Sequence, residues 1–135
     1  MGEAIERLVE AIRYPGKVPE GAVSFAMRVD DIELLAEEID GRIVMSWRLS
    51  GDDAELPKLA EYAAGRMLRE RAALAYENEG RTAVLWQDAP ADAEDRELTR
   101  FFETFMDSCD WWRARLDDMR GEGGPVAEEE VLIRP

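Results

Sequence analysis

The residues of this chain that could do acid–base chemistry are almost all carboxylates. Among 135 residues there are 31 Asp and Glu, 17 Lys and Arg, no histidine and one cysteine. The lack of histidine removes the commonest general base and the usual zinc ligand, and neither a phosphate-binding glycine motif nor a calcium-loop spacing occurs. Two groups of carboxylates could approach one another: Glu33, Glu37 and Glu38, and Asp107 and Asp110. Their spacings fit solvated faces of a strand and a helix better, so we expect neither an enzyme nor a metal or cofactor.

The charge of the chain restricts its partners. A formal net charge of −14 repels nucleic acid and anionic membranes, because binding to either depends on Lys and Arg. The acidity either keeps the protein in solution or favours a neutral or basic partner. One cysteine allows no internal disulfide, the first residues do not resemble a secretory signal, and no apolar run approaches the roughly 20 residues of a membrane span. These features predict a cytoplasmic protein.

The C-terminal third has the clearest pattern of elements. Residues 81–87 form an apolar run between Gly80 and Pro90, which predicts a strand covered on both faces, and residues 88–92 are expected to break the chain. A long helix is predicted next, because apolar residues then recur at intervals of three and four. They are Leu98, Phe101, Phe102, Phe105, Met106, Cys109, Trp112, Leu116 and Met119. Asp92, Glu94 and Asp95 are suited to stabilise the start of this helix.

The preceding residues alternate between helical and strand periods. Residues 3–14 are expected to form a short amphipathic helix, and residues 22–29 and 43–49 alternate as half-buried strands. Ile32–Ile39 favours a strand between them, with a helix as the rival interpretation, and Asp40-Gly41 favours a hairpin turn. A second helix is predicted from Leu56 to about Ala73, with Gly65 allowing another backbone to approach closely, and a short strand over 73–77. The predicted fold class is α+β, an antiparallel sheet with flanking helices in the order α-β-β-β-α-β-β-α.

The final strand and helix resemble a known family. The strand residues Val84-Leu85-Trp86, the nearby Pro90, the acidic helix start and the distal run Trp111-Trp112-Arg113-Ala114-Arg115-Leu116 resemble the C-terminal third of class I type III secretion chaperones. These small acidic bacterial proteins of the Tir-chaperone type dimerise and hold secreted effectors. The predicted order of elements is also theirs. The resemblance covers roughly residues 3–120, so we expect one chaperone-like domain over 1–120 and a flexible acidic tail over 121–135.

The resemblance implies a homodimer that binds the N-terminal segment of one or more effectors and keeps it extended for secretion, without a cofactor. The residues expected to contact the effector are apolar beyond what the core needs: Ile5, Val9, Val23, Phe25, Met27 and Val44. The subunits are expected to meet through the second helix and the strands over 73–87. The candidate interface residues are Leu59, Ala63, Met67, Leu74, Tyr76 and Leu85.

Several residues have two open interpretations. We expect Cys109 and Trp112 to pack in the core, and Trp47 and Trp86 to pack on a sheet face. Trp111 lies off the apolar stripe, so it is either covered by neighbouring arginine side chains or part of a subunit contact. In the tail, residues 131–133 are apolar and either extend freely or occupy a groove of the same chain until an effector displaces them.

A second function also fits the composition. A small acidic α+β domain could be an inhibitor or immunity-type protein that blocks a basic partner electrostatically. Its binding would weaken steeply with salt, whereas binding through apolar grooves and strand addition would not.

Overall fold

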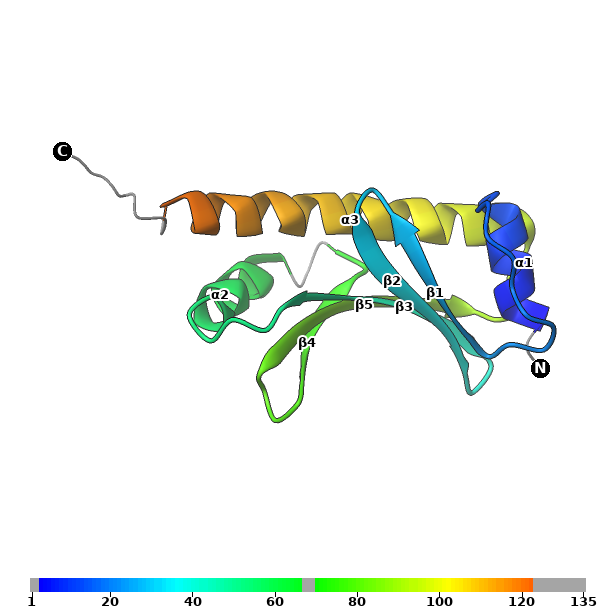
Figure 1. The fold of residues 1–135 in the computed structure, drawn as a ribbon, viewed down its shortest axis with the longest axis horizontal. Helices are drawn as coiled ribbons and strands as arrows, with labels where there is room; N and C mark the ends of the chain where they lie inside the picture. The colour runs from blue at the N-terminus through cyan, green and yellow to red at the C-terminus, as the bar shows by residue number, and fades with distance from the viewer. Residues whose placement is uncertain (1–2, 67–69, 123–135) are drawn as a thin grey trace.

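A computed structural model describes residues 3–66 and 70–122 of the chain. Its elements follow the predicted order (Figure 1). They are α1 (Glu3–Ala11), β1 (Ser24–Val29), β2 (Ile32–Ile39), β3 (Arg42–Ser50), α2 (Leu56–Arg66), β4 (Ala73–Glu77), β5 (Thr82–Pro90) and α3 (Asp95–Glu122). The predicted α+β class is confirmed, and Ile32–Ile39 is a strand and not a helix.

The five strands form one antiparallel sheet in the order β1-β2-β3-β5-β4. Tight turns explain why residues 24–50 form a meander. Asp30-Asp31 and Asp40-Gly41 each join two strands, and all four residues have positive φ, from 50° to 77°. Two residues with positive φ make a turn that matches the twist of the flanking strands. These turns fix both ends of β2, which decides its strand conformation.

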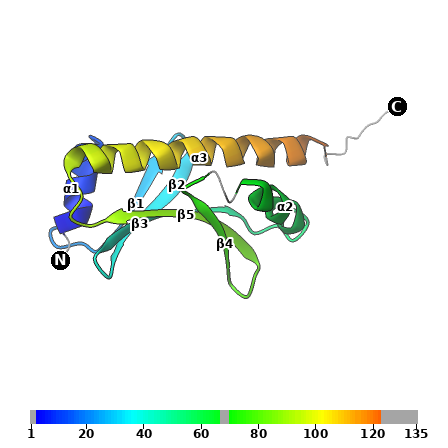
Figure 2. The same ribbon diagram turned by 180° about the vertical axis from the view of Figure 1, so that it is seen from behind.

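All three helices leave one face of the sheet uncovered. In Figures 1 and 2, α3 runs along one side of the sheet, with α1 near its N-terminal end and α2 near its C-terminal end. The core lies between α3, α1 and the near face of the sheet, and its largest buried side chains include Ile5, Met45, Leu85, Phe105 and Trp112. None of the described elements covers the opposite face.

The strand β5 is longer than the sequence indicated. Asp88 and Ala89 do not break the chain, because they pair with Val44 and Ile43 on β3, and Pro90 lies opposite Arg42. Pro90 is tolerated there because the pairing of β5 with β4 ends at Trp86, so no neighbouring strand needs its missing N–H. The expectation that β5 is covered on both faces holds at Val84, which is 4% exposed on the far face, but not at Trp86 on the same face, which is 37% exposed.

The helix boundaries also differ from the prediction. α1 ends at Ala11 and not at Tyr14, and α2 is described only to Arg66. Residues 67–69, including the end predicted for this helix, lie outside the described residues. α3 continues through Gly121 and Glu122, where a linker was expected, and the predicted tail from 123 onward also lies outside the described residues. A Cβ added at Gly65 would meet nothing within 4 Å, so within the described chain no backbone approaches this glycine.

The start of α3 is capped by Glu97, which lies outside the predicted set of Asp92, Glu94 and Asp95. Glu97 accepts a hydrogen bond of 3.2 Å from the Glu94 N–H, and the Leu98 N–H donates to the Glu94 carbonyl at 2.9 Å. This is the return half of a capping box, in which a side chain three residues into the helix satisfies the N–H of the cap residue. Arg7 of α1 donates to the carbonyls of Ala91 and Ala93 in the preceding loop, which fixes α1 against the start of α3.

Candidate functional site: two exposed surfaces and a fork in the sheet

The uncovered sheet face carries a row of mostly small or apolar side chains. Residues directly opposite one another on successive strands share a face of a sheet. The pairing places Ala26, Leu35, Ser46, Trp86 and Ala73 in one row across all five strands. Charged pairs lie on the same face around the row, Arg42 with Asp88 at 3.1 Å and Arg48 with Glu77 at 3.3 Å. This face offers apolar contact framed by charges.

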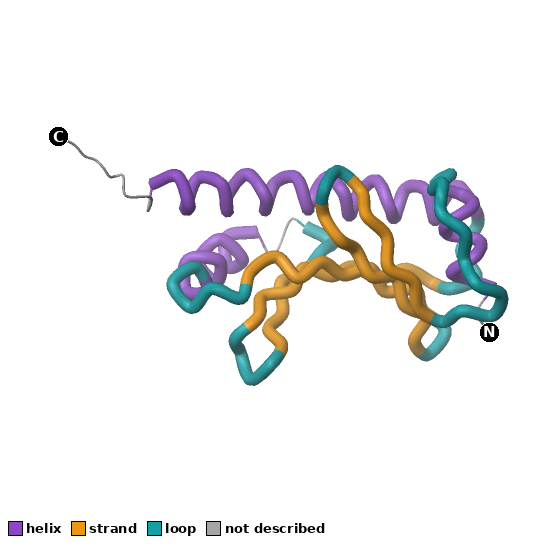
Figure 3. The backbone as a smooth tube through the Cα atoms, in the orientation of Figure 1, coloured by secondary structure: helices purple, strands orange, loops and turns teal. Residues whose placement is uncertain are grey.

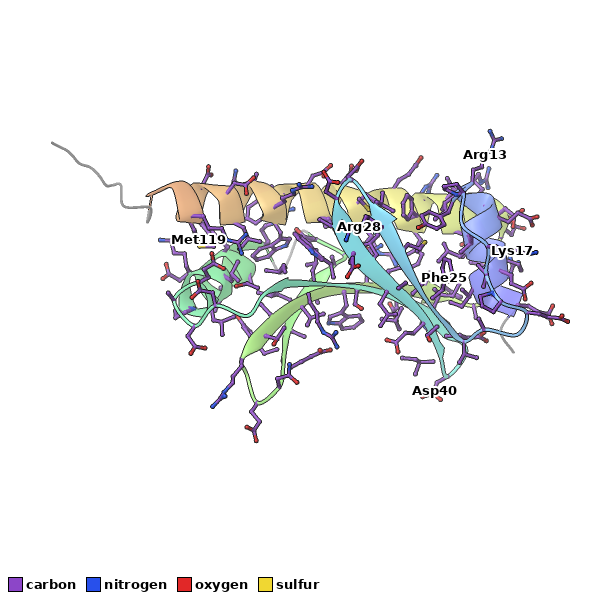
Figure 4. The ribbon with its side chains drawn as sticks, in the orientation of Figure 1. Arg13, Lys17, Phe25, Arg28, Asp40 and Met119 are labelled. Atoms are coloured by element: carbon purple, nitrogen blue, oxygen red, sulfur yellow. The ribbon has the colours of Figure 1, made fainter. Side chains whose placement is uncertain are left out.

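The six predicted effector-contact residues do not form a single groove. Ile5, Val9 and Met27 are buried in the core of the described chain. Val23 is 48% exposed just before β1, and Phe25 is half-buried on the helix side of β1, edge-on to Tyr14 with 5.9 Å between ring centroids (Figure 4). Val44 is half-buried on the opposite, uncovered face. Val23, Phe25 and Val44 are therefore the members of the set with surface to offer a partner.

A second exposed surface lies between α2 and β4. It contains a cavity of about 450 Å³ lined mainly by small and apolar side chains, among them Ala60, Ala63, Ala64, Leu74 and Tyr76. Three predicted interface residues, Ala63, Leu74 and Tyr76, thus come together here. The side chains of Leu59 and Leu85 are buried within the chain, and Met67 lies outside the described residues. We call this surface the α2–β4 patch.

Aromatic and charged contacts hold α2 against α3 beside this patch. The guanidinium groups of Arg66 and Arg115 lie over the Trp111 ring, at 3.9 and 4.9 Å from its centroid. Of the two interpretations of Trp111, covering by arginines is the one found in this chain. Trp112 donates its Nε1–H to Glu70 at 3.0 Å, and Glu70 also accepts from Arg66. Met119 lies further along the same helix, toward α2 (Figure 4).

A buried carboxylate fixes the end of α3 to the loop that precedes α2. Glu55 is 8% exposed and accepts two hydrogen bonds from Arg120, at 2.7 and 3.1 Å, and one of 2.6 Å from the Ser50 hydroxyl. The hydrogen bond from Arg120 is the main reason that the pKa of Glu55 lies below its ordinary value. At neutral pH this carboxylate is charged and ties α3 to β3 and α2.

The sheet forks between β2 and β3. Their pairing runs from Ile39–Arg42 to Leu35–Ser46 and ends there, although β2 continues back to Ile32 and β3 continues to Ser50. Figure 3 shows the β1–β2 hairpin rising toward α3 while β3 continues toward α2. Arg113 of α3 donates to the Asp30 carbonyl at 2.5 Å, which holds the hairpin tip against α3. A cavity of about 750 Å³ occupies the fork, with Leu116, Asp117 and Arg120 of α3 at its back.

No pattern in the sequence indicated the fork. Two strands of eight and nine residues joined by Asp40-Gly41 predict pairing along their whole length, which would place Ile32 opposite Leu49. The divergence follows from two contacts distant in sequence: the Arg113 hydrogen bond to the hairpin tip and the pairing of the second half of β3 with β5.

Of the residues considered for chemistry, Glu33 and Glu37 border the same cavity in the fork, whereas Cys109 lies in the core. Within residues 3–66 and 70–122, no group of three or more His, Cys, Asp or Glu side chains is arranged to hold a metal ion. Cys109 is fully buried, and burial raises the pKa of its thiol well above the usual range. Over the same residues, no helix is both long and apolar enough to cross a membrane.

Solved structures share this arrangement of helices and strands. A chain of the HopA1–SchA chaperone–effector complex matches with a TM-score of 0.63 and 14% identity, over 83% of this chain and 91% of that one. A chain of the ExoU–SpcU complex from the type III secretion system of Pseudomonas aeruginosa matches with a TM-score of 0.60 and 18% identity, over 82% and 92%. The chain has the fold of type III secretion chaperones.

YbjN of E. coli also shares the fold, with a TM-score of 0.57 and 12% identity over 78% of this chain and 82% of that one. No protein-family model and no curated protein sequence matches the chain. The structural matches confirm the chaperone-like fold that was expected from the regions around Trp86 and Trp111.

Proposed function

We propose that this protein is a type III secretion chaperone that binds the N-terminal segment of one or more secreted effectors and keeps it extended. The observation that carries the proposal is the fold, which spans nearly the whole length of chains solved in chaperone–effector complexes. The molecule is also suited to the task, because one entire sheet face and the α2–β4 patch are uncovered in the described chain.

The energetics of holding an extended segment call for many contacts. Ordering one backbone residue costs about 1–2 kcal/mol, whereas a fully buried Leu, Ile or Phe side chain contributes about 1.5–3 kcal/mol. An unfolded client is therefore held by several apolar anchors together with main-chain pairing. Val23 and Phe25 near the β1 edge, and Val44 with Trp86 on the open face, are the anchors we propose.

The proposed assembly is a homodimer formed through the α2–β4 patch. Ala60, Ala63 and Ala64 present little side chain, so two α2 helices can approach closely, and Gly65 has open space above it. Leu74 and Tyr76 supply larger apolar contacts from β4. Replacing Ala64 with Arg should produce monomers in light scattering, whereas the control Glu61→Arg, also exposed on α2, should stay dimeric.

We further propose that the protein acts in the cytoplasm on neutral or basic segments, in keeping with its net charge of −14. No catalytic step and no cofactor belong to this function. The tail is proposed to occupy a surface groove until a client displaces it. Unchanged client affinity after deletion of residues 123–135 would discard that role.

The test is capture of partners from the native bacterium with the tagged chain, followed by measurement of the mass of the complex. The proposal expects two copies of this chain with one larger secreted protein, bound through its N-terminal region and retained in high salt. A one-to-one complex with a compact basic protein, released by moderate salt, would instead establish the inhibitor function.

A further inference from the structure

The fork between β2 and β3 presents backbone hydrogen-bonding groups from two sides. The Glu38 N–H donates to the Val23 carbonyl on the β1 side at 2.8 Å, so odd-numbered residues of β2 direct their backbone groups toward β3. The Ala91 N–H donates to the Gly41 carbonyl at 2.9 Å, so even-numbered residues of β3 face β2. Beyond the last pair, Leu35–Ser46, Glu33 and Arg48 therefore direct their N–H and C=O groups into the fork.

These groups line a space of suitable size. Glu33 and Arg48 both border the cavity of about 750 Å³, and α3 closes its back with Leu116. Ligand pockets in proteins range from about 300 to 1,000 Å³. Backbone N–H and C=O groups that lack partners in the sheet are a template for another strand. An extended polypeptide backbone can form hydrogen bonds with the N–H and C=O groups on both sides of the fork.

The charged side chains that line the cavity indicate which charge an occupant should carry. Its lining has five carboxylates, from Asp31, Glu33, Glu37, Glu77 and Asp117, against three guanidinium groups. Ion pairs join Arg48 with Glu77, Arg120 with Glu55 and Arg28 with Glu33, and Arg113 donates to the Asp30 carbonyl. Within the described residues, the lining carboxylates outside these ion pairs are Asp31, Glu37 and Asp117. An occupant that brings positive charge is therefore favoured over an acidic one. This argues against residues 126–133 of the same chain, which contain three consecutive glutamates.

We propose that the fork is a binding site for one extended, neutral-to-basic segment of a partner protein, inserted between β2 and β3 within the sheet. The segment pairs with Arg48 on one side and Glu33 on the other. Because β2 and β3 are antiparallel to each other, it runs parallel to one of them and antiparallel to the other. The inference rests on the proposed function for the identity of its partner, and it adds a position inside the sheet to those at the sheet edges.

Amide hydrogen exchange of the full chain tests whether the fork is open in the free protein. In the free protein, the amides of Glu33 and Arg48 should exchange much faster than those of Leu35 and Ser46, which are paired in the ladder. If Glu33 and Arg48 are already protected, and deletion of residues 123–135 removes that protection, the tail and not a partner fills the fork. Protection that survives the deletion would show that the fork is closed.

A peptide of defined sequence tests whether the fork binds an extended basic segment. The probe is the acetylated and amidated peptide KVTVKVTVK, titrated to about 1 mM, a concentration that detects weak binding. Binding of this peptide should shift the NMR resonances of the Glu33 and Arg48 amides and slow their hydrogen exchange. The same peptide with its two central valines replaced by proline lacks the N–H groups of those two residues and should bind much more weakly. A third peptide, with Glu in place of each Lys, should also bind much more weakly. Failure of KVTVKVTVK to shift these amides would overturn the proposal.

Substitutions separate the fork from the sheet edge. Arg48→Pro removes the N–H that points into the fork and should weaken peptide binding about tenfold, whereas Arg48→Ala retains this N–H and should bind nearly normally. Ser24→Pro at the outer edge of β1 is the matched control, and in it the peptide should still protect the Glu33 and Arg48 amides as in the parent. Unchanged binding by a folded Arg48→Pro variant, or an equal loss in Ser24→Pro, would contradict the proposal.

Failure of this inference differs from failure of the proposed function. If Arg48→Pro still holds an effector in a two-to-one complex with unchanged affinity, the fork is not the site but the chaperone function remains. If the parent chain holds no secreted protein while the peptide occupies the fork, the site remains and the chaperone function fails.

Discussion

From Leu98 to Cys109, α3 is held by buried apolar side chains on one face, whereas from Trp111 to Arg120 it combines two buried side chains, Trp112 and Leu116, with cation–π and ionic contacts. The first half faces α1 and the sheet, and the second half faces α2 and the fork. Apolar contacts depend little on pH or salt, while charged contacts between partly exposed groups depend on both. The first half of α3 should therefore be insensitive to pH and salt, whereas the second half, which borders the candidate binding surfaces, should respond in part to both.

The largest expected effect comes from the apolar half. Replacing Phe105, which is fully buried, with Ala should lower the free energy of unfolding by about 3–5 kcal/mol, because both burial and packing are lost. Denaturant titration followed by circular dichroism measures this. The control Phe102→Ala, at a half-buried position on the same helix, should cost clearly less. Equal losses for the two variants would contradict the difference in burial between these two positions.

A buried polar group beneath α3 should limit the stability of the same region. Gln87 on β5 is 2% exposed, and in the described chain its side-chain amide has no hydrogen-bond partner. An unsatisfied buried polar group costs about 1–3 kcal/mol, so Gln87→Met should raise the unfolding free energy by a similar amount. The same titration checks this, with Gln87→Glu expected to be destabilised. A loss of stability in Gln87→Met would show that the amide has a partner.

The hydrogen bonds between Glu55 and Arg120 should stabilise the second half of α3. Glu55→Gln should lower the unfolding free energy by about 1.5 kcal/mol, at the low end for charged hydrogen bonds, because Arg120 is half exposed. The pKa of Glu55 is lowered in the folded state, so its contribution is complete at neutral pH. This contribution is lost as pH falls below 4.5 and through the folded-state pKa. Thermal melts of parent and variant should therefore differ at pH 7 and converge in acid.

The smallest expected effect concerns the Trp111 stack. Arg115→Ala removes one of the two guanidinium groups beside the ring and should cost about 0.5–1 kcal/mol. It should also shift the tryptophan fluorescence as the ring becomes more exposed. Arg100→Ala is the control, since Arg100 is exposed in the first half of α3 and should leave both signals unchanged.

The parts of the fold that sequence patterns predicted are those governed by local rules. The period of residues 98–119 predicted α3 and its buried stripe, and Asp40-Gly41 predicted the β2–β3 turn. The extension of β5 to Pro90 was not predictable locally, because it depends on a partner strand more than 40 residues earlier in the chain.

The candidate surfaces were less predictable than the fold. Val9 and Val23 are the same residue type, and only the packing of α1 against α3 buries the first and leaves the second exposed. The cover on Trp111 comes from Arg66 on another helix as well as from its neighbour Arg115. Which apolar residues remain for a partner depends on such tertiary contacts, and periodicity alone does not contain them.

The hydrogen bonds from Arg7 have a consequence for biosynthesis. Arg7 contacts carbonyl groups 84 and 86 residues further along the chain, so α1 has no complete docking site until the β5–α3 loop has left the ribosome. Contacts this distant in sequence slow folding, because a long loop must close before they form. We therefore expect the protein to reach its native state after most of its synthesis is complete. Until then, the apolar side of its first helix is available to other proteins of the cell.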